Sequence, residues 1–185
     1  MRSSLATSCS LLAVVLAACG TQVRSAAPAA SSVAAALKGS PPPLAALHAE
    51  ANQLLAGGRA AFDSQLARLR GYPVVVNKWA SWCGPCQTEF PAFQGAALAY
   101  GRRVAFLGLD GKDHGPAAMA FLRRFPVTYP SFSDPQESIA RKIKAATYYP
   151  ETIYFDRQGR IVFEHAGPYV SAGTLEADVR RHVLR

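Results

Sequence analysis

From Leu44 onward, apolar residues fall either at helical spacing or in short β-branched runs. The helical spacing predicts helices over 44–55, 62–69, 83–100, 116–125, 133–143 and 171–183. The β-branched runs predict strands over 73–79, 103–109, 151–155 and 160–164, and the order leaves room for one more short strand before the fifth helix. A turn over 156–159 joins the last two strands into an antiparallel hairpin. This order predicts an α/β fold with a central mixed sheet, helices on both faces, an antiparallel C-terminal hairpin and an N-terminal helical extension.

The N-terminus has a different pattern, in which one basic residue precedes a short apolar core at 11–16 and the small pair 17–18. These features predict a secretory signal peptide over 1–18, since the apolar core is too short to span a bilayer. The sequence Leu16-Ala17-Ala18-Cys19 resembles the bacterial lipobox. The resemblance implies cleavage before Cys19 and lipid on that cysteine. An ordinary signal peptide, with a cysteine there by accident, is the alternative.

Between the expected cleavage site and the first predicted helix, 17 of the 24 residues in 20–43 are Ala, Ser, Pro or Gly. No apolar period runs through them, and three prolines close the stretch. We therefore expect 19–43 to be a lipid-bearing extended tether, which holds a domain of residues 44–185 close to an extracytoplasmic membrane surface.

Composition narrows the choice of protein class. Half of the 185 residues are hydrophobic and 17% are charged, which excludes general disorder. The formal charge of +8 comes from basic residues scattered as singles and doublets rather than gathered in a stripe. This predicts a solvated basic surface, attracted at most to anionic lipid, and no nucleic-acid partner.

The candidate chemistry lies in the sequence WCGPC at 82–86, between a predicted strand and the helix that follows it. Cys83 falls at the helix N-terminus, where free N–H groups and the helix dipole favour a thiolate. Cys86 follows one turn later, close enough to form a disulfide, and Pro85 is tolerated in a first helical turn. Trp82 is expected to shield the sulfur from water on one side. A thiolate here would attack a substrate disulfide, and the second cysteine would resolve the mixed disulfide.

A structural zinc site is the competing interpretation of two cysteines at this spacing. It needs two more ligands at short spacing, but the remaining cysteines lie at Cys9 and Cys19. The histidines stand alone in sequence, at His48, His114, His165 and His182. We therefore expect no metal.

Two motifs in the same order resemble the TlpA/ResA-like branch of the thioredoxin superfamily: residues 75–86 with the following Glu-Phe-Pro at 89–91, and residues 148–156. The resemblance implies a thioredoxin-like fold and a membrane-tethered, extracytoplasmic thiol-disulfide oxidoreductase without a cofactor beyond its redox-active disulfide. It makes Cys83 and Cys86 the catalytic pair, with Pro150 as a cis-proline beside them. It gives supporting roles to Trp82, Gly84, Pro85, Asn77 and Tyr149, the last through its exposed backbone.

Two positions depart from thioredoxin or from the family pattern. Thioredoxin has an aspartate six residues before the first cysteine, where this chain has Asn77. Because an amide cannot accept the proton of Cys86, Glu89 becomes the candidate base, with a helix-surface carboxylate as the alternative. Lys78 stands where the family has an aromatic or apolar residue, and we expect its stem to be buried and its ammonium to reach solvent. A functional ammonium that lowers the pKa values of nearby groups is the alternative.

Other functions fit less well. A peroxiredoxin-like thiol peroxidase would have proline at Val76 and Thr or Ser at Ala80. A copper-delivery protein of the Sco type would have three residues between its cysteines, although His165 lies in a suitable zone.

Within disulfide chemistry, the sequence leaves open whether the protein reduces disulfides or forms them. The Gly-Pro dipeptide between the cysteines is that of thioredoxin, whose potential is about −270 mV, against about −120 mV for the oxidant DsbA. This favours a reductase of protein disulfides, which outside the cytoplasm must receive its electrons through a membrane donor. Some members of the family that the chain resembles prepare apocytochrome thiols for haem attachment, so the resemblance implies apocytochrome c as a substrate. An oxidase using the same cysteines is the alternative.

Overall fold

The computed structural model describes residues 27–184, so the predicted signal peptide and Cys19 lie outside the described residues. The helices are α1 (Ala30–Leu37), α2 (Pro42–Ala49), α3 (Gly58–Arg68), α4 (Gly84–Tyr100), α5 (Gly115–Arg124), α6 (Ser138–Lys142) and α7 (Ala172–His182). The strands are β1 (Leu54–Leu55), β2 (Val74–Trp79), β3 (Ala105–Gly111), β4 (Ser131–Asp134), β5 (Glu151–Phe155) and β6 (Ile161–Ala166).

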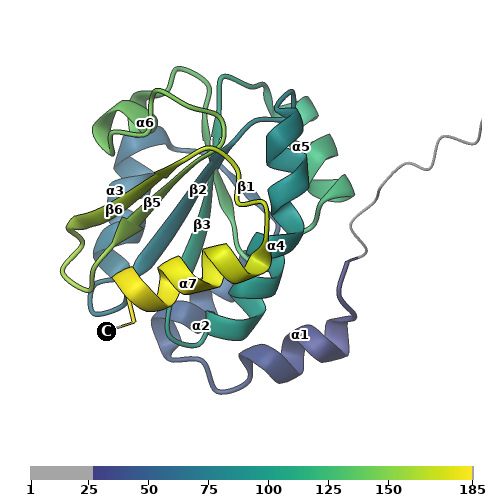
Figure 1. The fold of residues 1–185 in the computed structure, drawn as a ribbon, viewed down its shortest axis with the longest axis vertical. Helices are drawn as coiled ribbons and strands as arrows, with labels where there is room; N and C mark the ends of the chain where they lie inside the picture. Colours follow the sequence, from purple (N-terminus) through teal and green to yellow (C-terminus); the bar gives the residue numbers. More distant parts are fainter. Residues whose placement is uncertain (1–26, 185) are drawn as a thin grey trace, which may run out of the picture.

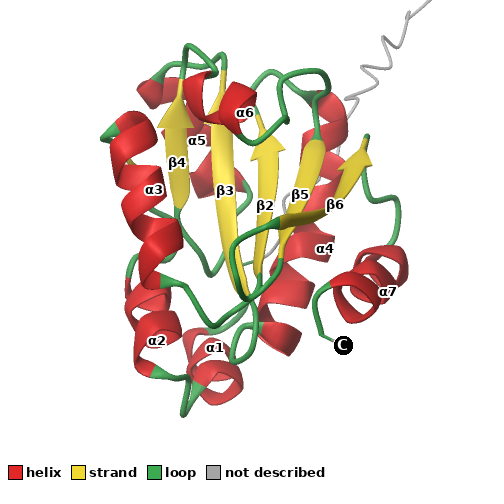
Figure 2. Cartoon of the chain, turned by 90° about the vertical axis from the view of Figure 1, so that its left-hand side faces the viewer, coloured by secondary structure: helices red, strands yellow, loops and turns green. Residues whose placement is uncertain are grey.

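The strands form one mixed sheet in the order β1-β4-β3-β2-β5-β6 (Figures 1 and 2). β1, β4, β3 and β2 run parallel, whereas β5 is antiparallel to both β2 and β6. β2 is buried along its whole length because helices cover both faces of the sheet. The thioredoxin-like fold, with its mixed sheet and C-terminal hairpin, is confirmed.

Alternation along β2 divides the core into two layers. Val75 and Trp79 pack with apolar residues of α4, α5 and α7, and Val74 and Val76 pack with those of α2, α3 and α6. The Trp79 ring stacks on Phe121 of α5, with the centroids 4.7 Å apart, and forms a T-shaped pair with Phe90 of α4. Aromatic pairs of this kind add roughly 0.5–1.5 kcal/mol beyond the area that they bury. They fix the start of α4 against the carboxyl end of β2.

The N-terminal part of the described chain is more ordered than its composition indicates. Residues 30–37, expected to be extended, form α1, and α2 begins at Pro42 within the expected spacer. Alanine has the highest intrinsic helix propensity, and proline is favoured in a first helical turn. The expectation of an extended chain throughout 19–43 is therefore wrong for Ala30–Leu37 and from Pro42 onward, and Figure 1 shows α1 beside α4.

Two predicted helices are also shorter than expected. The helix predicted over 44–55 ends at Ala49 because Asn52 adopts φ of 61° and bonds to Leu122, Val127 and Tyr129, which turns Leu54–Leu55 into the sheet. The helix predicted from 133 starts at Ser138. The segment before it forms β4, and the carboxylate of Asp134 accepts the N–H groups of the first helical turn.

Candidate active site

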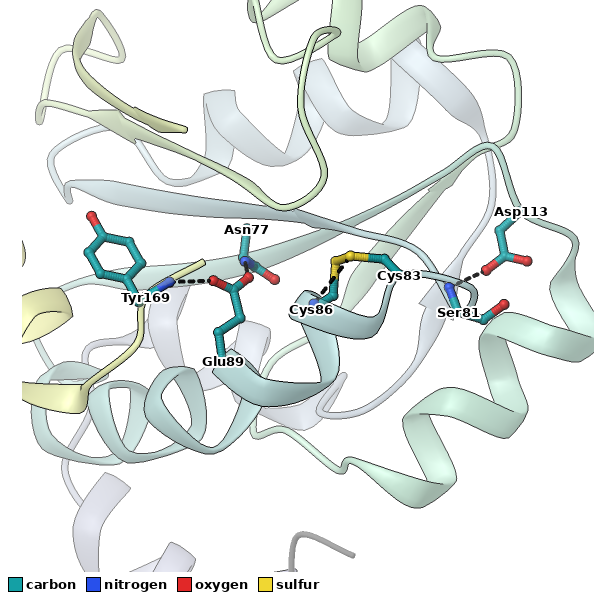
Figure 3. The surroundings of a disulfide bond; sticks show 7 residues. All are labelled: Asn77, Ser81, Cys83, Cys86, Glu89, Asp113 and Tyr169. Atoms are coloured by element: carbon teal, nitrogen blue, oxygen red, sulfur yellow. Dashed lines mark hydrogen bonds between the residues drawn. A yellow bond between two sulfur atoms is a disulfide. The ribbon is translucent and has the colours of Figure 1, made fainter. Parts of the chain in front are cut away.

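The two cysteines lie at the N-terminus of α4 and form a disulfide with an S–S distance of 2.02 Å (Figure 3). Cys83 is the N-cap of the helix, and its Sγ accepts the backbone N–H of Cys86 at 3.2 Å. Cys83 is 3% exposed and Cys86 is fully buried. An N–H donor and the positive end of a helix both stabilise a thiolate at Cys83, which makes this sulfur the natural nucleophile once the disulfide is reduced.

Glu89 lies one turn after Cys86 on the same helix, and it is fully buried. Its carboxylate accepts Asn77 Nδ2 at 2.5 Å and the backbone N–H of Tyr169 at 3.0 Å (Figure 3). Burial raises the pKa of Glu89 to about 7, although the two hydrogen bonds act in the opposite direction. The alternative of a helix-surface carboxylate is therefore wrong. A carboxyl group with a pKa near neutrality is suited to proton transfer.

The opposite side of β2 holds Lys78, whose position corrects the sequence interpretation. Lys78 is fully buried, so its ammonium does not reach solvent. Its Nζ lies 2.9 Å from Glu137 Oε1 and 3.8 Å from the centre of the Tyr149 ring. A buried cation needs a counter-charge, and the carboxylate that supplies it lies 59 residues away in the sequence.

The Tyr149–Pro150 peptide bond is cis, as the family resemblance implies. Lys78 pairs with Glu151 in the β2–β5 register, so Pro150 lies directly before β5, beside the carboxyl end of β2. Trp82 is 56% exposed; its ring lies 4.8 Å from that of Tyr149, and its indole N–H donates to the carbonyl of Lys112. The indole is thus held against the cis-proline segment.

Sequence analysis missed two carboxyl groups beside this loop. Asp113 Oδ2 accepts the N–H of Ser81 at 2.6 Å, two residues before Cys83 (Figure 3). Burial opposes ionisation of Asp113, but hydrogen bonds from the Ser81 side chain and from the backbone N–H groups of Ser81 and His114 outweigh it and hold the pKa below its usual range. Asp110 is buried beside it, and burial together with the Asp113 charge raises the pKa of Asp110 to about 8. Asp110 lies at the carboxyl end of β3, which runs parallel to β2, and Asp113 follows that strand; this placement is the signal that could have found them.

Among the described residues, no cluster of His, Cys, Asp and Glu is suited to hold a metal ion. His165, the candidate for the copper alternative, stacks on the Tyr169 ring with centroids 3.9 Å apart. None of the helices within 27–184 combines the length and the apolar character needed to cross a bilayer.

The fold and the capped disulfide define a thioredoxin-like domain, and comparisons with known proteins agree. Residues 51–164 match the model of the AhpC/TSA family, and the chain belongs to this family. The thiol:disulfide interchange protein DsbE homolog of Paracoccus denitrificans is 34% identical over 114 residues, which cover 61% of this chain and 60% of that protein. The thiol-disulfide oxidoreductase ResA of Geobacillus kaustophilus is 25% identical over 65% of this chain and 67% of its own length.

A solved structure gives the same result. The DsbF homologue from Corynebacterium diphtheriae superposes with a TM-score of 0.58 at 28% identity, over 63% of this chain and 75% of that one. The resemblance to TlpA/ResA-like proteins is thus confirmed at the level of family and fold.

Proposed function

We propose that the protein is a thiol-disulfide oxidoreductase that reduces protein disulfides with Cys83 and Cys86. The observation that carries this proposal is the position of Cys83, which caps α4, accepts the Cys86 N–H and is joined to Cys86 in a disulfide. The names of its relatives, thiol:disulfide interchange proteins and ResA, support the same chemistry. The chain spans about three fifths of the P. denitrificans relative, so the activity is argued here from the site itself.

The proposed reaction transfers two electrons. The Cys83 thiolate attacks one sulfur of the substrate disulfide; that S–S bond breaks, a Cys83–substrate disulfide forms, and the first substrate sulfur leaves and takes up a proton. Cys86 then loses its proton and attacks Cys83. The Cys83–Cys86 disulfide forms and the second substrate thiol is released. A thiol donor must afterwards reduce this disulfide.

The reducing direction is supported by the Gly84-Pro85 dipeptide, which is that of thioredoxin. We expect the reduction potential of the Cys83–Cys86 pair to lie nearer −270 mV than −120 mV, measured by equilibrating the purified protein with thiol buffers of known ratio. Catalysis of insulin reduction by a small thiol reductant should accompany it. A potential near −120 mV would instead assign an oxidase that uses the same cysteines.

We also propose that the domain works outside the cytoplasm, anchored by lipid on Cys19, with a membrane donor of electrons and with apocytochrome c among its substrates. The lipobox-like sequence at 16–19 supports the anchor. Two or more acyl chains give stable attachment, because each buried methylene contributes about 0.8 kcal/mol. We expect a mature chain that begins at an acylated Cys19, measured as the intact mass of protein from the membrane fraction. An unmodified mature chain in the soluble fraction would contradict the anchor.

A further inference from the structure

Two aromatic side chains at the active site, Trp82 and Tyr149, are joined to each other through a set of polar contacts. Trp82 precedes Cys83, and Tyr149 precedes the cis-proline. The Tyr149 hydroxyl donates to Glu137 Oε1 at 2.7 Å, and the Trp82 indole donates to the carbonyl of Lys112. Lys112 Nζ lies 3.1 Å from Glu137 Oε2, so both aromatic side chains are linked to one carboxylate.

Glu137 is ionised in this setting. Its side chain is 8% exposed, and burial opposes its charge. The hydrogen bond from Tyr149 and the two lysines, Lys78 and Lys112, outweigh burial and lower the pKa of Glu137 to about 2. Of the two lysines, Lys78 is the buried one, and its ammonium also lies against the face of the Tyr149 ring.

The backbone around these contacts is unusual at two residues. Lys112 and Glu137 adopt the left-handed conformation, with φ of 50° and 53°, which non-glycine residues rarely adopt. Such conformations persist where the surroundings determine them strongly, and they gather at functional sites. Gly111 makes room for the ring, because a Cβ at this position would overlap the Tyr149 hydroxyl.

We infer that Glu137 is a positioning residue for extended substrates, which keeps Tyr149 and Trp82 in one fixed arrangement beside Cys83. This inference rests on the proposed function. A substrate that lies along the cis-proline segment then meets a preformed surface and loses less conformational freedom on binding than with a mobile one. A small disulfide needs only the sulfur of Cys83 and gains nothing from the arrangement.

The test compares KM and kcat for two substrates in Glu137→Gln. We expect KM for insulin to rise roughly tenfold, because the neutral glutamine has a single acceptor oxygen and holds Tyr149 and Lys112 less firmly than the carboxylate does. The kcat for insulin and the rate with oxidised glutathione should stay within about twofold of wild type, and the reduction potential should be unchanged. An unchanged KM for insulin, or an equal loss with oxidised glutathione, would overturn the inference.

Two further variants separate positioning from folding. Glu137→Gln leaves Lys78 buried with a neutral partner and could unfold the domain, so Lys78→Met/Glu137→Gln removes both charges and should show the same rise in KM. Gly111→Ala should raise KM by displacing the Tyr149 ring with every charge retained. Gly115→Ala is its matched control, because a Cβ at Gly115 meets open space.

These variants also distinguish the two proposals. Wild-type protein that fails to reduce insulin would overturn the proposed function itself. Active wild-type protein, with folded Gly111→Ala and double variants that keep the wild-type KM, would overturn only the role of Glu137.

Discussion

Replacing Cys83 with serine is expected to abolish disulfide reduction, with a loss on the order of 10³-fold or more. Serine keeps the N-cap position, since its oxygen also accepts N–H groups, so α4 should be retained. The hydroxyl is not ionised near neutral pH and cannot attack a disulfide. The measurement is insulin reduction with dithiothreitol as the electron source, with the circular dichroism spectrum as the check on folding.

Cys86→Ser is the matched variant, because it changes the other cysteine by the same atom. Cys83 remains at the helix N-terminus and can still form the mixed disulfide, which then has no resolving thiol. We expect a covalent complex with substrate that accumulates on non-reducing gels and has the mass of both partners. A complex trapped by Cys83→Ser and not by Cys86→Ser would reverse the two roles.

The nucleophile could be predicted from sequence because everything that positions it is local. Cys83, Pro85 and Cys86 lie within one helical turn, directly after a β-branched strand, so adjacent residues determine their geometry. The cis-proline segment was also recognised, but only through the family resemblance.

The contacts around that turn could not be predicted because they join distant segments. Glu89 is fully buried and accepts the backbone N–H of Tyr169, 80 residues later. From the sequence alone, its carboxylate fits a helix surface as well as an active site. Lys78 forms its ion pair with Glu137, the residue that caps the N-terminus of α6, and the sequence does not show that α6 begins next to β2. The Ala, Ser and Pro content of residues 30–37 predicts a spacer, whereas in the fold this alanine-rich segment is a helix that contacts α4.

Replacing Glu89 with glutamine is expected to slow release of the mixed disulfide by roughly 10–100-fold and to leave its formation nearly unchanged. Formation uses the thiolate of Cys83, which the helix N-terminus already stabilises. Release needs the proton of Cys86 to be removed, and Glu89 lies one turn away with a pKa of about 7. In wild type the release rate should rise with pH around 7, as Glu89 becomes able to accept a proton, and this step should disappear in Glu89→Gln. Stopped-flow measurement of both steps from pH 5.5 to 8.5 gives the answer.

The same pKa predicts an effect on stability that a surface carboxylate would not have. The folded state retains the Glu89 proton up to about pH 7, whereas the unfolded chain loses it near the ordinary value of 4.5. The wild-type free energy of unfolding should therefore fall as pH rises between these values, by up to ~3 kcal/mol relative to Glu89→Gln. Glu164→Gln, on the exposed face of β6, is the control and should follow wild type in both measurements. If Glu89→Gln keeps the wild-type pH profile for release while it removes the slope in stability, the carboxyl is buried but water accepts the proton of Cys86.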